Sequence, residues 1–200
     1  MNRLLWGLLI FVMASVLALS GWTWLHRPSA SGPSGPAVLP IYGSVPPLTL
    51  TDESGLPFSL AGLQGRVWVV DFIFTSCAGQ CPQMTAQMAA LQRRLPSTVH
   101  LVSITVDPVR DTPAALTVYA KTWGSDLKRW HFLTGEVADI ERLTREGFRL
   151  SYAEGGTAEE PITHSVRFVL VDGRGKIRGY YDGTDPTAVN RLVQNAEGLE

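Results

Sequence analysis

One apolar run sets the strongest limit on how this chain of 200 residues can fold. Residues 67–74 read Val-Trp-Val-Val-Asp-Phe-Ile-Phe, and β-branched and aromatic residues on both faces are typical of a strand buried in the middle of a sheet. Residues 82–95 then carry apolar side chains at spacings of four, three and four, which is the pattern of one helical face. These are Met84, Met88, Leu91 and Leu95. A buried strand that leads directly into an amphipathic helix predicts an α/β fold.

The rest of the chain alternates between strand and helix in the same way. Residues 48–51 and 57–60 flank the turn Asp-Glu-Ser-Gly and predict a short hairpin. Thr112 followed by Pro113 is typical of a helix start. We further expect strands at residues 99–106, 131–133, 165–171 and 176–181, and helices at residues 112–123, 136–146 and 185–196. This order predicts a central mixed sheet flanked by helices.

The first 27 residues are typical of a targeting segment. A run without charge extends from Leu4 to Leu25, and as a helix it would span ~33 Å. It predicts a transmembrane helix with a cytoplasmic N-terminus, which leaves the domain in the periplasm or an equivalent extracytoplasmic space. A cleaved signal peptide is the alternative, because residues 18–20 resemble a cleavage site. Residues 28–45 are rich in Pro, Gly and Ser and predict a tether, and residues 46–200 are the predicted folded domain.

Charge and cysteine content exclude several classes of function. The formal net charge is −1 and there is no dense run of lysine or arginine, so we expect no nucleic-acid partner. Two cysteines, four positions apart, cannot form the disulfide framework of a small secreted domain. The pair is therefore typical of a site, either a reversible disulfide or two soft ligands for one metal ion.

The cysteine pair follows the predicted strand of residues 67–74 and precedes the next helix. Open α/β folds place their sites at this carboxyl edge of the sheet. The start of a helix stabilises a thiolate, so we expect at least one of Cys77 and Cys81 to be unusually reactive. One helical turn would bring both sulfurs to the same side. A metal would need a third ligand, for which the chain offers His26, His100, His131 and His164.

Of these histidines, His164 is the best candidate for a ligand, because it lies in a predicted loop directly before an apolar strand. A lone histidine in a loop, however, more often has no ligand role. Three aspartates also accompany the predicted elements. Asp71 interrupts the buried strand, where it would either handle protons for a thiol pair or face a wet edge. Asp107 follows a strand and would either help to polarise the site or only shape a turn. Asp111, two residues before Pro113, is expected to cap the following helix.

In five ordered blocks, residues 46–183 resemble the Sco/SenC family of copper-binding, thioredoxin-like proteins that assist the assembly of cytochrome c oxidase. The blocks are Val-Asp-Phe-Ile-Phe-Thr-Ser-Cys at 70–77 with Cys-Pro at 81–82, Ser-Ile-Thr-Val-Asp-Pro-Val-Arg-Asp-Thr-Pro at 103–113, Phe-Leu-Thr-Gly at 132–135, His-Ser at 164–165, and Leu-Val-Asp at 170–172 with Gly175. The resemblance implies a thioredoxin-like fold for the domain. An N-terminal membrane helix followed by a tether also suits this family.

The resemblance implies a copper site. Cys77, Cys81 and His164 match its ligands for Cu(I) or Cu(II), and the two cysteines would also form a redox-active disulfide. Asp107 and Thr163 are candidates to lie next to these ligands and orient them without binding the metal. Family members often carry an aspartate directly before the ligand histidine, where this chain has Thr163. A carboxylate that would orient the imidazole is then missing, which bears on copper affinity and redox poise.

Two functions follow as expectations. The first is a copper chaperone that assembles the dinuclear copper site of a haem–copper oxidase by copper delivery, by thiol reduction, or by both. The alternative is a membrane-anchored thiol–disulfide oxidoreductase that does not require copper. The expected partners are the oxidase subunit that carries the dinuclear site, the membrane, and other copper chaperones or thioredoxin-like reductants.

Overall fold

The structure, a computed structural model, describes residues 2–25, 39–77, 79–154 and 162–200. The chain divides between Ala37 and Val38 into two units. The first contains helix α1 (Asn2–Leu25), where the sequence predicts a helix. Within the described residues, no helix is both long and apolar enough to cross a membrane, so the predicted membrane crossing is not confirmed. Residues 28–38 of the predicted tether lie outside the described residues.

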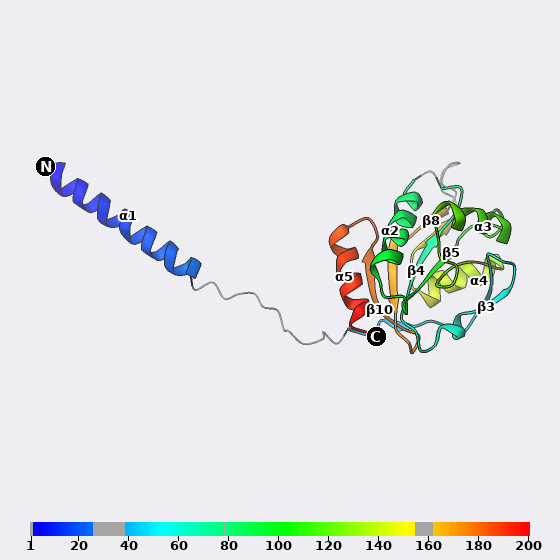
Figure 1. Ribbon diagram of the computed structural model, residues 1–200. Coiled ribbons are helices and arrows are strands. Elements are labelled where there is room, and N and C mark those ends of the chain that lie inside the picture. Colours follow the sequence, from blue (N-terminus) through cyan, green and yellow to red (C-terminus); the bar gives the residue numbers. More distant parts are fainter. Residues whose placement is uncertain (1, 26–38, 78, 155–161) are drawn as a thin grey trace. The chain divides into compact units, whose positions relative to one another are not determined.

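An eight-stranded mixed sheet forms the centre of the second unit (Figure 1). Its strand order is β1-β10-β9-β4-β5-β6-β2-β3. Strands β4, β5 and β6 are parallel, whereas β9 is antiparallel to β4. The strands are β1 (Gly43–Ser44), β2 (Thr49–Asp52), β3 (Pro57–Ser59), β4 (Trp68–Ile73), β5 (His100–Thr105), β6 (Trp130–Thr134), β9 (Arg167–Val171) and β10 (Lys176–Asp182). All residues of β4 and β5 are buried, which confirms the predicted central strand.

Helices supply apolar side chains to both faces of the sheet. On one face the core includes residues of α2 (Cys81–Arg94), α3 (Pro113–Thr122) and α5 (Pro186–Glu197). On the other face it includes residues of α4 (Val137–Arg142), of the π-helical turn η2 (Leu143–Gly147) and of the 3-10 turn η1 (Leu60–Leu63). Successive residues of β4 alternate between the two clusters, with Val69 in the first and Val70 in the second, as a two-residue period requires.

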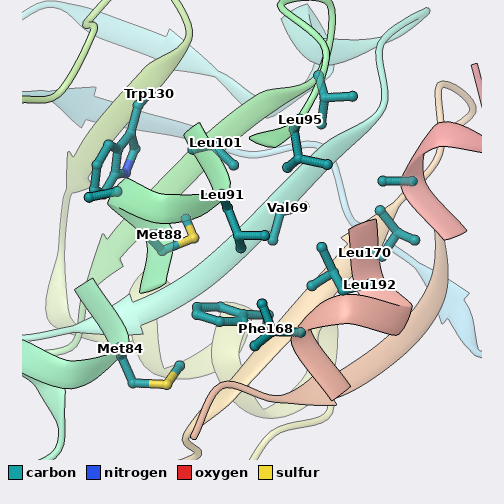
Figure 2. Close-up of a cluster of buried hydrophobic side chains, with 14 of the residues drawn as sticks. Val69, Met84, Met88, Leu91, Leu95, Leu101, Trp130, Phe168, Leu170 and Leu192 are labelled. Carbon is teal, nitrogen blue, oxygen red and sulfur yellow. The ribbon is translucent and has the colours of Figure 1, made fainter. Parts of the chain in front are cut away.

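The predicted apolar face of α2 packs into the first cluster (Figure 2). Met84, Met88 and Leu91 have no exposed surface. They lie in the same cluster as Val69 of β4 and Phe168 of β9. The helix therefore holds its N-terminus, which carries Cys81, firmly against the carboxyl end of the central strands.

Three short strands do not match the predictions. Gly43 of β1 pairs with Ile177 of β10, so this part of the predicted tether belongs to the sheet. Strands β7 (Tyr152–Glu154) and β8 (Ile162–His164) form a separate antiparallel pair. His164 therefore ends a strand and does not lie in a loop. The cause is backbone pairing, since His164 is opposite Tyr152.

Candidate functional site

The cysteine pair lies in the connection between β4, which ends at Ile73, and α2, which begins at Cys81. Neither cysteine is joined in a disulfide; Cys77 is half-buried and Cys81 is buried. Their side chains are hydrogen-bonded to each other. The two side chains therefore meet at the carboxyl edge of the sheet, as their spacing predicts.

The two thiols differ in their burial, and this difference affects their reactivity. Burial raises the pKa of the Cys81 thiol, the hydrogen bond with Cys77 and the charge of Asp71 add to the rise, and a hydrogen bond from the Phe74 backbone offsets only part of it. Cys81 is therefore not the unusually reactive cysteine that the helix start predicts, because burial outweighs the field of α2. Cys77 is the more exposed sulfur and is the one that a partner reaches first.

Asp111 fixes the loop that leads to Cys77. Its carboxylate has no exposed surface, and it accepts hydrogen bonds from Thr75 N at 3.0 Å, Thr75 Oγ1 at 2.5 Å and Thr105 Oγ1 at 2.5 Å. The predicted helix cap at Asp111 is wrong. Thr112 caps α3 by accepting a hydrogen bond from Ala115 N. Asp111 turns inward because the buried hydroxyl of Thr105 and the half-buried donors of Thr75 need an acceptor.

Replacing Asp111 with alanine is expected to lower the free energy of unfolding by about 3 kcal/mol, because the donors of Thr75 and Thr105 lose their acceptor. Urea unfolding of the reduced chain measures this change. Asp139→Ala is the matched control: Asp139 forms a surface ion pair with Arg142, and its loss should change the free energy by less than about 0.5 kcal/mol. A similar small change for Asp111→Ala would contradict the anchoring role.

Asp71 lies in the middle of β4, the strand that leads into the cysteine loop. It has no exposed surface, so the alternative of a wet edge is wrong. Oδ1 accepts a hydrogen bond from Ser103 Oγ at 2.6 Å, and Ser103 Oγ accepts one from Trp130 Nε1 at 3.0 Å. Oδ2 has no partner among the described residues. Burial raises the pKa of Asp71 to about 7, against a partial offset from the Ser103 hydrogen bond.

The charge of Asp71 reaches the thiol site. It contributes to the raised pKa of Cys81 and to that of Tyr119, whose hydroxyl is hydrogen-bonded to Thr85 Oγ1 at 2.7 Å. Thr85 Oγ1 in turn donates to the carbonyl oxygen of Cys81 at 3.0 Å. Asp71, whose raised pKa of about 7 lets its charge change near neutral pH, therefore acts on Cys81 at the start of α2.

Asp107 shapes the turn that follows β5. Its carboxylate pairs with Arg110 Nη1 at 3.1 Å, and its carbonyl oxygen accepts a hydrogen bond from Asp111 N at 2.9 Å. These contacts are those of turn structure, the second of the two roles predicted for this residue. A supporting role of Asp107 at a metal site stays a prediction.

The predicted third ligand is described only in part. The backbone of Thr163 and His164 forms the end of β8, but their side chains lie outside the described part, so the ligand role of His164 and the supporting role of Thr163 stay predictions. Among the side chains that are described, no three His, Cys, Asp or Glu residues form a metal-binding group.

The other histidines give no better ligand among the described residues. His100 begins β5, at the opposite end of the parallel strands from the cysteine loop. Its ring stacks on that of His131, with centroids 5.9 Å apart, and its Nε2 lies 2.8 Å from Arg66 Nη1. His26 lies outside the described residues.

Comparison with known proteins identifies the family. The SCO1/SenC family model matches residues 43–196. This chain belongs to the SCO1/SenC family. A SCO1 homologue of Bacillus subtilis is 33% identical over 162 residues, which cover 79% of this chain and 83% of the relative. A protein of Stutzerimonas stutzeri that is named for copper binding is 30% identical over 185 residues, which cover 90% of this chain and 88% of the relative.

The fold of this SCO1/SenC chain also matches solved structures. The structure of BsSco is titled for a disulfide switch in a member of the Sco family of cytochrome c oxidase assembly proteins. It is 32% identical, with a TM-score of 0.70 and coverage of 78% of this chain and 93% of BsSco. The predicted thioredoxin-like mixed α/β fold is confirmed.

Proposed function

We propose that this SCO1/SenC chain carries copper as cargo on Cys77, Cys81 and His164 and delivers it to the dinuclear copper site of a cytochrome c oxidase subunit. The observation that carries the proposal is the pair of reduced cysteines, hydrogen-bonded to each other, at the carboxyl edge of the sheet. Two neighbouring thiolates are the soft ligands that copper(I) prefers, and an imidazole suits either oxidation state. The names of the Stutzerimonas relative and of BsSco support copper and oxidase assembly.

The unequal burial of the two thiols suits a protein that binds copper and then releases it to an acceptor. Copper uptake displaces the protons of both thiols, and the raised pKa of Cys81 makes that step harder at low pH. Cys77 is the more exposed sulfur, so an acceptor thiolate reaches the metal from its side. Copper then passes from this chain to the acceptor by exchange of one ligand at a time.

The test is a transfer experiment with the full chain. The copper-loaded reduced chain is mixed with the copper-binding domain of an oxidase subunit whose dinuclear site is empty and reduced, and the two are separated. We expect copper to move to the acceptor. If copper stays on the donor, or moves equally well from free copper at the same concentration, delivery by this chain is wrong.

Thiol–disulfide exchange is a second candidate, favoured by the hydrogen bond between the two cysteines and by the disulfide switch named for BsSco. In this reaction the Cys77 thiolate attacks a disulfide of the partner, and one partner thiolate leaves. The Cys81 thiolate then attacks the Cys77 sulfur of the mixed disulfide, and the second partner thiolate leaves. The products are an oxidised Cys77–Cys81 pair and a partner reduced by two electrons.

The unequal burial of the thiols predicts their order in this exchange. Cys81→Ser is expected to accumulate the mixed disulfide, because the exposed Cys77 still attacks and no second thiol resolves it. Cys77→Ser should form at least about tenfold less, because Cys81 is buried and its pKa is raised. Non-reducing gel electrophoresis after mixing with a disulfide-containing oxidase domain measures both. Equal trapping by the two variants would contradict the assignment.

We further propose that residues 1–27 direct the domain out of the cytoplasm, into the periplasm or an equivalent space, either as a retained membrane anchor or as a cleaved signal. The support is the charge-free run of Leu4–Leu25. In an oxidising compartment, paired thiols need a reductant or a metal to stay out of a disulfide, which agrees with either candidate function.

A further inference from the structure

One pocket in the described part of the chain is lined by two arginines. Its cavity has a volume of about 370 Å³. Arg149 and Arg167 line it together with the rings of Tyr42 and Tyr180, and Ser165, which directly follows His164, lies at its wall. Neither candidate function uses these residues.

The strand register places this pocket on the face and edge of the sheet that carry the cysteines. Strand β9 is antiparallel to β4, with Val169 opposite Val70, so Arg167 lies toward the carboxyl end of β4, from which the chain continues to Cys77. Arg167 shares a face with Val169, because they are two residues apart. Val169 belongs to the core cluster that contains Cys81 and borders Cys77.

The charges of the two arginines are not neutralised within the described part of the chain. Arg110, Arg142, Arg145 and Arg178 each form an ion pair with a carboxylate, whereas Arg149 and Arg167 form none. Asp182 is opposite Arg167 in the β9–β10 register. Its Oδ1, however, accepts hydrogen bonds from Thr184 N at 2.8 Å and Thr184 Oγ1 at 2.6 Å, and Arg167 influences it only through its field.

The pocket is held in shape before any ligand binds. Arg149 has a φ of 55°, a left-handed conformation that is unfavourable for a residue with a side chain. Its guanidinium packs against Gly43, where an added Cβ would lie 3.6 Å from Nε. The rings of Tyr42 and Tyr180 meet edge to face at 5.5 Å. Tyr180 OH donates to the carbonyl oxygen of Phe148 at 3.0 Å, which fixes the wall between the arginines.

We propose that this pocket is a docking site for an acidic peptide segment of the client protein that Cys77 and Cys81 serve. Guanidinium groups bind carboxylates through paired hydrogen bonds, and two of them without an ion pair to a described carboxylate give the pocket a preference for a segment with neighbouring carboxylates. The tyrosine rings offer contact area at low entropic cost. Docking here holds the client beside the thiols. The proposal deepens the proposed function and rests on it for the identity of the client.

Peptide binding to the full, reduced, copper-free chain tests the proposal. The probe is a hexaglutamate peptide, with hexalysine as its charge-reversed counterpart, and affinity is measured by calorimetry at low and at physiological salt. We expect hexaglutamate alone to bind, and more weakly at higher salt. Arg149→Glu and Arg167→Glu should each weaken binding at least about tenfold, and the glutamine variants should do so less. Thermal unfolding confirms that each variant is folded.

The matched control is Arg174→Glu. Arg174 is an exposed arginine in the β9–β10 turn, without an ion pair in the described structure and outside this pocket. This reversal should weaken hexaglutamate binding by less than about threefold. No binding to the unaltered chain, or equal losses in all three reversals, would overturn the docking site. Binding of phosphatidylglycerol vesicles that depends on both arginines, without peptide binding, would also overturn it and would mark a membrane contact.

Copper retention, measured on the same samples, separates this proposal from the proposed function. We expect the arginine variants to keep copper while they lose the peptide. A chain that binds the peptide through Arg149 and Arg167 but retains no copper would leave the docking site standing and overturn copper carriage. A chain that retains copper but does not bind the peptide would leave copper carriage standing and overturn the docking site.

Discussion

Replacing Asp71 with asparagine is expected to stabilise the reduced chain at pH 8 by about 2–4 kcal/mol, and to leave its stability nearly unchanged at pH 4. Most substitutions of a buried residue destabilise, so the direction of this effect is a sharp test. It follows from a carboxyl group that is fully buried, has one oxygen without a partner, and has a pKa raised to about 7.

The sign follows from the proton count of the two states. Below about pH 4, Asp71 is protonated in both the folded and the unfolded chain. Between about pH 4 and pH 7 the unfolded chain loses this proton and the folded chain keeps it, so the wild-type free energy of unfolding falls as the pH rises. Above pH 7 the full cost of the buried charge is present, about 4 kcal/mol for a rise from 3.8 to about 7. Asparagine removes this cost but adds an amide donor without a partner.

Urea unfolding at pH 4, 6 and 8 measures the difference between the two chains. Asp139→Asn is the control, because the Asp139 carboxylate is in a surface ion pair and its loss should give a small difference that hardly depends on pH. If Asp71→Asn were less stable than the wild type at pH 8, or if the difference were the same at all three pH values, the assignment of a proton-binding Asp71 would be wrong.

Loss of a predicted copper ligand should have the largest effect on function. Cys77→Ser and Cys81→Ser are each expected to lower copper(I) affinity by roughly 100-fold or more, because a hydroxyl is a poor ligand for a soft ion. His164→Ala should lower it by at least about tenfold, since even residues that only support a ligand cost about 10–100-fold. Competition with a copper(I) chelator measures all three affinities.

The histidine variant distinguishes copper carriage from thiol exchange. His164→Ala should leave the rate of mixed-disulfide formation by Cys77 within about twofold of the wild type, because thiol exchange does not require the imidazole. His131→Ala is the matched control, since the His131 ring stacks on His100 and is not a predicted ligand. Copper affinity that is unchanged in His164→Ala, or equally lowered in His131→Ala, would rule out His164 as the third ligand.

Elements that depend on local pattern were predictable from the sequence. The buried strand β4 follows from its continuous apolar run, the core face of α2 from the spacing of Met84 and Met88, and the start of α3 from Thr112 with Pro113. The placement of the cysteine pair at the carboxyl edge of the sheet follows from these local features. It needs only a strand, a turn and a helix in succession.

Features that depend on distant partners were not predictable in the same way. Asp111 lies where a helix cap is usual, and only the folded chain brings Thr75 and Thr105 to it. The helix start predicts a lowered pKa for a thiol, but the burial of Cys81 has the opposite and larger effect. The pairing of β7 with β8 was not predictable because these strands are three residues long, too short for a two-residue period to be visible.

The measurement that tests the central claim most directly is copper retention by the full chain, prepared with Cys77 and Cys81 either reduced or joined in a disulfide. After excess copper is removed by gel filtration, we predict about one copper ion per reduced chain. With copper(II), an absorption band from charge transfer between thiolate and metal should accompany it. The disulfide form should show neither. A reduced chain without retained copper and without this band would contradict the account.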